Sequence, residues 1–165
     1  MKEIRQLETQ LTRVAGLLRE DPDPTDLRSE RVSDWSVGEQ VDHVLKVLES
    51  SLARLAAPGK PLDRGINVVG RILLKVGRLP RGVGKSPRSV LPAARSRAEL
   101  ADALDDVRER LRSLAAQADV WRSQRPLVPH PYFGGLTPKQ GARMLVVHTD
   151  HHLRIVSDIR RAAGR

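Results

Sequence analysis

Cysteine is absent from the 165-residue sequence. Its absence excludes disulfide frameworks, thiolate catalysis, and zinc or iron–sulfur sites built on cysteine. Aromatic residues are scarce, with two tryptophans, one tyrosine and one phenylalanine. No apolar run approaches the roughly 20 residues that a membrane-spanning helix needs, and the charged opening MKEIRQLETQ does not resemble a secretory signal. We therefore expect a soluble, cytoplasmic protein.

Acidic residues are nearly missing from one part of the chain. Residues 60–97 hold ten basic side chains and one acid, Asp63, whereas the rest of the chain has 19 basic and 19 acidic residues. The ten cations are Lys60, Arg64, Arg71, Lys75, Arg78, Arg81, Lys85, Arg88, Arg95 and Arg97. The formal charge of +9 is therefore carried by this one stretch, called the basic segment below.

The sequence also lacks a sustained alternation of apolar and polar residues, which would indicate β-strands. We find no convincing hairpin turn. Apolar residues instead recur at spacings of three and four, which is the helical period. Such patterns cover residues 2–20, 36–57, 62–79, 96–118 and 137–159. Four long helices and one connecting helix predict an all-α protein, a single domain over residues 1–165 folded as an antiparallel four-helix bundle.

Three helix starts are marked by capping boxes, in which a Ser or Thr and a Glu or Gln three residues later bond each other's backbone N–H groups. The pairs are Ser36 with Glu39, Ser96 with Glu99, and Thr137 with Gln140. Pro138 occupies the first helical position, where proline is favoured. Pro58 and Gly59 are expected to end the second helix. These signals define where three of the four long helices begin.

The basic segment is expected to contain the connecting helix, placed between the second and third long helices. Over residues 62–79 its basic side chains oppose an apolar side, and three glycines lower its intrinsic stability by about 1 kcal/mol each. The apolar side comprises Ile66, Val69, Ile72, Leu73 and Val76. We therefore expect this helix to need docking on the bundle, and residues 80–95 to form a mobile loop.

The role of the basic segment has several interpretations. Clustered Lys and Arg are typical of surfaces that bind nucleic acid or an anionic membrane. Nucleic acid is disfavoured because the segment has no aromatic residue for base stacking and no adjoining recognition motif. A solvated surface, a polyanion partner, and a lid that attracts an anionic substrate stay open.

Four of the five histidines lie between His130 and Ile159. On the helix predicted there, His148 and His152 are one turn apart near the middle of the apolar arc, close enough for both rings to hold one divalent ion. Two partly buried, hydrogen-bonded histidines are the alternative. His151 lies on the shoulder of the arc. His43 lies on the flank of its own helix, so spacing alone does not place it in the core.

Two motifs stand out around these histidines. In DWSVGEQVDHVLKV, Trp35 precedes His43 by eight residues, and HTDHHLRIV holds His148 and His152. Together they resemble the DinB-like (YfiT-like) superfamily of metal-binding four-helix bundles, and HPYFGGLTP followed by HTDHHL resembles especially one branch of it. The resemblance implies that His43 joins His148 and His152 in a three-histidine site for a divalent metal, with zinc or nickel expected.

The same resemblance implies a thiol-dependent transferase or isomerase, in which a low-molecular-weight thiol meets a small-molecule substrate. The chemistry agrees, because three neutral imidazoles leave the full 2+ charge on the ion and one position open to ionise water or a thiol. We therefore predict a metal-dependent enzyme of transferase or hydrolase type. The alternative is a non-catalytic metal-binding module, or an interaction module that works through the basic segment. A homodimer stays open in each case.

Four further residues are candidates for orienting a ligand ring or moving a proton. They are Glu39, His130, Tyr132 and His151. Glu39 lies one turn before His43, although its place in a capping box explains it equally simply. His130 lies between two prolines and has a structured turn as its alternative interpretation.

Overall fold

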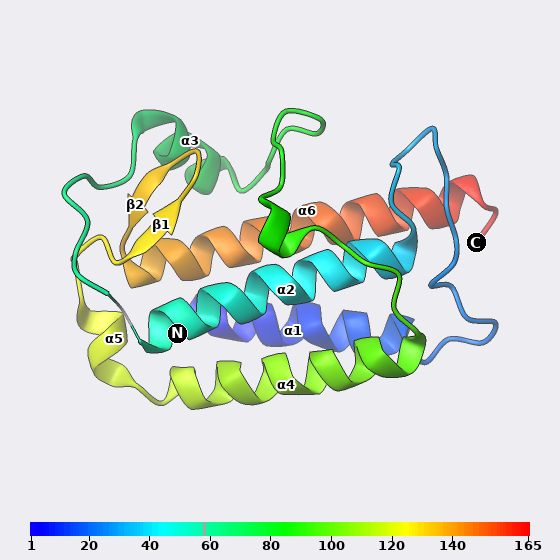
Figure 1. The fold of residues 1–165 in the computed structure, drawn as a ribbon, viewed down its shortest axis with the longest axis horizontal. Helices are drawn as coiled ribbons and strands as arrows, with labels where there is room; N and C mark the ends of the chain where they lie inside the picture. The colour runs from blue at the N-terminus through cyan, green and yellow to red at the C-terminus, as the bar shows by residue number, and fades with distance from the viewer. Residues whose placement is uncertain (58) are drawn as a thin grey trace.

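The computed structural model describes residues 1–57 and 59–165, in which four long helices are joined by shorter elements (Figure 1). In chain order these are α1 (Lys2–Leu17), α2 (Val37–Ala56), α3 (Val68–Val76), a 3₁₀ turn (Arg88–Val90), α4 (Arg97–Ala115), α5 (Ala118–Arg122), β1 (Val128–His130), β2 (Gly134–Leu136) and α6 (Pro138–Ala162). The predicted all-α bundle is confirmed. Pro58, expected to help end the second helix, lies outside the described residues.

All three predicted capping boxes are present. The hydroxyls of Ser36, Ser96 and Thr137 each accept a hydrogen bond from the backbone N–H three residues later, and the side chain found there accepts one in return. Each satisfies two backbone donors that would otherwise lack partners at a helix start. The starts of α2, α4 and α6 therefore follow directly from the sequence.

The core lies where the four long helices face one another. α1 and α2 each pack against both α4 and α6. Leucines dominate the side chains that are almost completely removed from water: Leu7, Leu11, Leu45, Leu48, Leu52, Leu55, Leu100, Leu111, Leu114 and Leu136. Burying each stabilises the fold by about 2 kcal/mol. Among the described residues, no helix is both long and apolar enough to cross a membrane.

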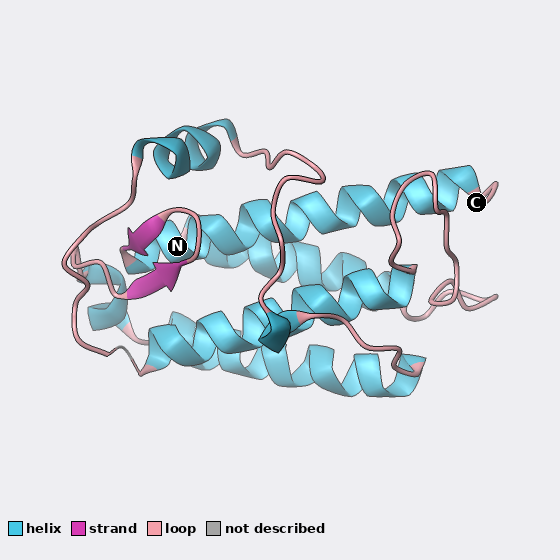
Figure 2. Ribbon diagram, turned by 45° about the horizontal axis from the view of Figure 1, so that its top comes forward, coloured by secondary structure: helices cyan, strands magenta, loops and turns pink. Residues whose placement is uncertain are grey.

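The order of the helices forces the basic segment to cross the bundle. Ion pairs join Asp42 to Arg95 near the starts of α2 and α4, and Glu49 to Arg110 further along, so these two neighbours run in the same direction. The chain leaving α2 must therefore return along the bundle before α4 begins, a long crossover connection (Figures 1 and 2). On the way it contacts both α2 and α6.

The connecting helix is shorter than predicted. α3 begins after Asn67, whose side chain accepts a hydrogen bond from the backbone N–H of Gly70, and ends at Gly77, which has a left-handed backbone with φ of 73°. Asparagine is a favoured N-cap and glycine a favoured C-terminal cap. The predicted span of residues 62–79 overlooked both signals.

The predicted apolar side of this helix is covered only in part. Ile66 is buried and Leu73 packs against the core, but Val69, Ile72 and Val76 are exposed. Gly70 and Leu74 are the buried residues of the helix. A Cβ atom on Gly70 would lie 2.8 Å from the side chains of both Ile66 and Phe133. Gly70 therefore determines which face of α3 packs on the bundle, because only glycine allows the helix to approach Phe133 so closely.

A short hairpin that the sequence did not predict precedes α6. β1 and β2 pair antiparallel, with Val128 opposite Leu136 and His130 opposite Gly134. Strands of three residues that contain proline and glycine are too short to show alternation. The hairpin carries His130 and Tyr132 beside the start of α6 (Figure 1).

Candidate metal centre

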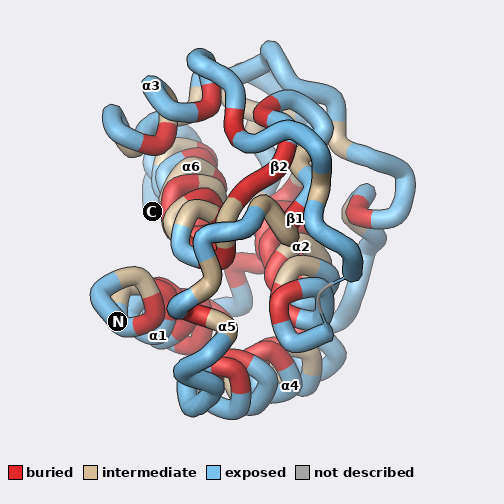
Figure 3. Tube along the Cα trace, turned by 90° about the vertical axis from the view of Figure 1, so that its left-hand side faces the viewer, coloured by how far each residue is buried: buried red, intermediate tan, exposed pale blue. Residues whose placement is uncertain are grey.

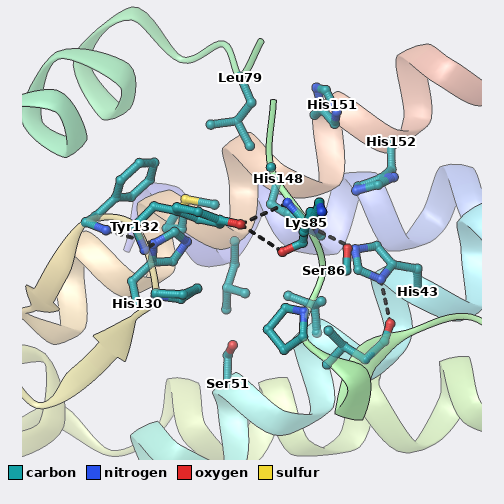
Figure 4. Close-up of a pocket in the computed structure, with 18 of the residues that line it drawn as sticks. His43, Ser51, Leu79, Lys85, Ser86, His130, Tyr132, His148, His151 and His152 are labelled. Atoms are coloured by element: carbon teal, nitrogen blue, oxygen red, sulfur yellow. Dashed lines mark hydrogen bonds between the residues drawn. The ribbon is translucent and has the colours of Figure 1, made fainter. Parts of the chain in front are cut away.

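Three histidines converge between α2 and α6. His43 comes from α2, and His148 and His152 come from successive turns of α6 (Figure 4). One ring nitrogen from each lies within 4.8 Å of the others, and the Nε2 atoms of His43 and His148 are 3.2 Å apart. The three residues predicted as ligands are thus brought together in the fold.

The geometry and donor set of the cluster fit a divalent ion. Zinc lies about 2.0 to 2.1 Å from histidine nitrogens, so two ligands of a tetrahedral ion are about 3.3 Å apart. Among the described residues, no carboxylate joins the cluster. Three neutral imidazoles suit zinc and nickel, and also copper and iron. The cluster could therefore hold a metal ion.

Two hydrogen bonds orient the histidine rings. The Nδ1 atom of His43 lies 2.6 Å from the carbonyl oxygen of Val90, and the Nδ1 atom of His152 lies 2.6 Å from Oε1 of Gln40. The Gln40 amide is held in turn, because its Nε2 donates to the hydroxyl of Ser33. Metal-binding histidines usually have such a partner on the ring nitrogen that does not bind the ion.

These bonds define where the ring protons lie. A carbonyl oxygen only accepts, so Nδ1 of His43 and of His152 must donate, and in a neutral ring the Nε2 atom then carries a lone pair. The lone pair of His43 faces Nε2 of His148. Either His148 donates a proton to it, or a cation lies between them. A divalent cation beside the three Nε2 atoms would accept a lone pair from every ring at once.

Burial keeps the three rings uncharged. It lowers the pKa of His148 to about 3, with a further contribution from the neighbouring histidines. Burial also lowers the pKa of His152 and of His43 below the ordinary histidine value. Trp35 covers the pair, with its ring 5.0 Å from that of His43 and 6.3 Å from that of His152. The rings are therefore neutral at pH 7, as metal ligands must be.

A cavity of about 820 Å³ extends from the histidines. His148 and His152 lie at one part of its wall, and the hairpin with His130 and Tyr132 at another (Figure 4). Much of the wall is aliphatic, including Leu73, Leu79, Leu136, Leu145 and Ile155. The arrangement suits a small, largely apolar molecule with one end near the histidines.

Residues 79–95 are called the strap below, and its part from Leu79 to Val90 forms one side of this cavity. Asp42, which has no exposed surface, accepts a hydrogen bond from the backbone N–H of Ala93 and lies 3.3 Å from Nε of Arg95. It also pairs with Lys46 at 2.7 Å. Asp42, the residue before His43 in sequence, thereby fixes the position of the strap, which supplies the Val90 carbonyl.

The hairpin holds the other end of the strap. The hydroxyl of Tyr132 accepts a hydrogen bond from the backbone N–H of Lys85 at 2.8 Å and donates one to its carbonyl at 3.0 Å. Tyr132, which was predicted to support catalysis, lines the cavity, and its hydroxyl is bonded to the strap.

The remaining predicted residues lie at different distances from the cluster. His151 lines the cavity, and its ring centre is 5.1 Å from that of His152. His130 also lines it, stacks on Phe133 at 4.1 Å, and accepts two backbone N–H bonds at Nδ1. Burial lowers the pKa of His130 to about 4. Glu39 is held in its capping box and pairs with Arg28 at 2.8 Å, and it does not line the cavity.

Sequence reasoning overlooked Gln40, Asp42 and Val90. Gln40 was within reach of prediction, because it shares the flank of α2 with His43 and lies three residues before it. Val90 acts through its backbone carbonyl, which every residue possesses. No sequence pattern could therefore have identified it.

Comparison with known families decides the classification. The sequence model of the DinB superfamily matches residues 6–156, nearly the whole chain. The chain belongs to the DinB superfamily. Searches of curated proteins and of solved structures found no match. Membership in the DinB superfamily agrees with the helical bundle and with a three-histidine cluster that could hold a metal ion.

Proposed function

We propose that this DinB superfamily protein is a metal-dependent enzyme that activates a thiol or water against a small, largely apolar substrate. The observation that carries the proposal is the meeting of three neutral imidazoles at the wall of an apolar cavity, where the Nδ1 protons of His43 and His152 are bonded to acceptors outside the cluster. His43, His148 and His152 would hold the ion. Zinc and nickel are the metals we expect, since both accept imidazole ligands.

A bound divalent ion would supply Lewis-acid chemistry, lowering the pKa of a water or thiol ligand. The chain's own residues do the rest. Val90 and Gln40 orient two of the rings, and Trp35 shields them from water. His151 borders the cavity next to the cluster, and burial lowers its pKa, so it is neutral at pH 7 and able to accept a proton.

Several parts of the proposal rest on chemistry rather than on contacts. A low-molecular-weight thiol as co-substrate, a cytoplasmic location and a homodimer all stay predictions. For Glu39 we propose a structural role, because its carboxylate is already engaged at the start of α2. His130 we assign to shaping the cavity wall through its bonds to the hairpin backbone.

The test begins with metal content. The protein is purified without a metal-affinity tag, and bound zinc and nickel are measured before and after each metal is added. We expect one ion per chain in the wild type and none in His148→Ala. The matched control is His151→Ala, which removes a neighbouring histidine of the same helix and should keep the ion. A wild type that takes up no metal would refute the proposal.

Catalysis is tested on the metal-loaded protein with a panel of thiols and small apolar electrophiles, and with hydrolysable esters and amides. We expect turnover that disappears in His148→Ala and falls in His151→Ala, whose metal content is intact. Metal uptake without turnover of any compound would favour the alternative, a non-catalytic metal-binding module.

A further inference from the structure

The outward face of α3 is apolar. Val68, Val69, Ile72 and Val76 are exposed by 69%, 60%, 54% and 63%. Gly70 and Leu74, on the opposite side of the helix, are buried against the bundle. At 100° per residue Ile72 points almost directly away from this buried side. The nine residues of α3 therefore present four aliphatic side chains to solvent. Figure 3 shows α3 mostly in the colour of exposed residues, whereas the long helices carry buried residues where they face one another.

Basic side chains border this face. Lys75 and Arg71 lie about 60° and 100° around the helix from Ile72, and Arg78 follows the last turn. Within the basic segment as the structure describes it, the ion pairs formed are those of Arg81, Arg95 and Arg97. The charges of Lys75, Arg71 and Arg78 thus have no acidic partner among the described residues.

The strap contributes a further exposed apolar side chain, Val83, on the same side of the molecule as α3. Val83, exposed by 73%, lies between Arg81 and Lys85. Val83 and Val69 both border the cavity. α3 and this part of the strap project from the side of the bundle opposite α4 (Figures 1 and 2).

We propose that α3 and the strap around Val83 dock on the surface of an anionic lipid bilayer. Aliphatic side chains beside uncompensated Lys and Arg are the pattern of a helix that lies in the plane of a membrane interface. A partner of opposite charge suits the segment that carries the whole net charge of +9. The mouth of the cavity would then lie against lipid, which is a source of apolar molecules. The proposal does not depend on the metal.

A second copy of the chain fits this surface less well. In a symmetric dimer the same patch contacts itself, so Arg71, Lys75 and Arg78 would be brought against their own copies. Like charges at close range cost free energy. A lipid surface provides the opposite charge. Because a bilayer is fluid, it can also adapt to two separate projections, α3 and the strap around Val83.

The proposal is tested by vesicle flotation of the full chain. Vesicles of phosphatidylcholine alone are compared with vesicles that also contain phosphatidylserine, at low and high salt. We expect binding to the mixed vesicles only. Arg71→Gln with Lys75→Gln should weaken it roughly 30-fold, given about 1 kcal/mol for each cation at an anionic surface. Ile72→Ser with Val76→Ser should weaken it at least about tenfold, because apolar contact is lost.

The control is Arg112→Gln with Arg122→Gln, which removes the same charge from α4 and α5 and should change binding little. Circular dichroism checks that each variant folds, as expected for exposed positions. Absence of wild-type binding at low salt would overturn the proposal. So would binding that the two serine substitutions leave unchanged, since that is adsorption by charge alone. A concentration-dependent dimer that the serine substitutions abolish would favour a second copy instead.

Discussion

The Nδ1 atom of His43 lies 2.6 Å from the carbonyl oxygen of Val90, 47 residues further along the chain. Val90 belongs to the strap, and the strap lies across the bundle because α2 and α4 run in the same direction. The connection between two helices therefore takes part in building the candidate metal centre. Any movement of the strap would change the orientation of the His43 ring.

Gln40 is predicted to raise the metal affinity without binding the ion. Gln40→Leu removes the acceptor for Nδ1 of His152, and loss of such a partner typically lowers metal affinity about 10- to 100-fold. Gln40→Glu keeps an acceptor and should recover much of the affinity. Titration with zinc against a competing chelator measures the effect.

A control for this change is Gln10→Leu, because Gln10 is also buried and also bonds α6, through the carbonyl of Val146. That variant should lose stability and keep its zinc affinity. Equal losses of zinc affinity in Gln10→Leu and Gln40→Leu would mean that Gln40 acts only through packing.

Asp42 is predicted to stabilise the strap. Asp42→Asn leaves the nearby cations Lys46 and Arg95 without their buried partner, so the free energy of unfolding should fall by about 2 to 4 kcal/mol. Denaturant unfolding measures it. Asp150→Asn, which breaks a more exposed pair with Arg154, should cost less than about 1 kcal/mol. Similar losses in the two variants would contradict the role assigned to Asp42.

Acid is predicted to destabilise the metal-free protein well above the pH at which carboxylates titrate. The pKa is about 3 for His148 and about 4 for His130 in the folded chain, and about 6.5 for a histidine in an unfolded chain. The unfolded state therefore takes up more protons as the pH falls below about 6.5, and stability is lost. Above that pH the contribution is fully present.

Between about pH 7.5 and about pH 5.5 we expect a loss of about 1 kcal/mol for each such histidine. Urea unfolding in the presence of a chelator measures it. In His148→Gln the loss over this range should be smaller. A free energy of unfolding that stays constant down to pH 5 would show that these rings are protonated as easily as exposed ones.

Tyr132 is predicted to hold the strap closed. Tyr132→Phe removes both hydrogen bonds to the Lys85 backbone, at a cost of about 1 kcal/mol for each. Cleavage by trypsin within the strap, at Arg81 or Lys85, should therefore become roughly 30-fold faster. Metal affinity should change little. Ser51→Ala alters the cavity wall on the α2 side and serves as the control, with cleavage at the wild-type rate.

Local signals predicted much of this fold. The capping boxes at Ser36, Ser96 and Thr137 were found correctly because each depends on two side chains three residues apart. The docked face of α3 was predicted only in part, because it depends on Gly70 packing against Phe133, a residue more than sixty positions away. Hydrophobic periodicity records which residues are apolar and not what covers them.

For the candidate site, the three histidines were predicted from the sequence, and the hydrogen bonds that orient their rings were not. Spacing suggested His148 and His152, and the motif resemblance added His43, which spacing alone left outside the core. Their meeting depends on the antiparallel pairing of α2 and α6. The hydrogen bonds that orient them come from Gln40 and from the Val90 backbone, and the second requires the course of the strap to be known.

The central claim is that His43, His148 and His152 hold one divalent ion through their Nε2 atoms. X-ray diffraction from crystals grown with zinc, with data collected on both sides of the zinc absorption edge, locates the ion by its anomalous signal. The account predicts one strong peak about 2.0 to 2.1 Å from the three Nε2 atoms. A peak bound instead by His130 or His151, or no peak among the three histidines in crystals soaked with zinc, would contradict it.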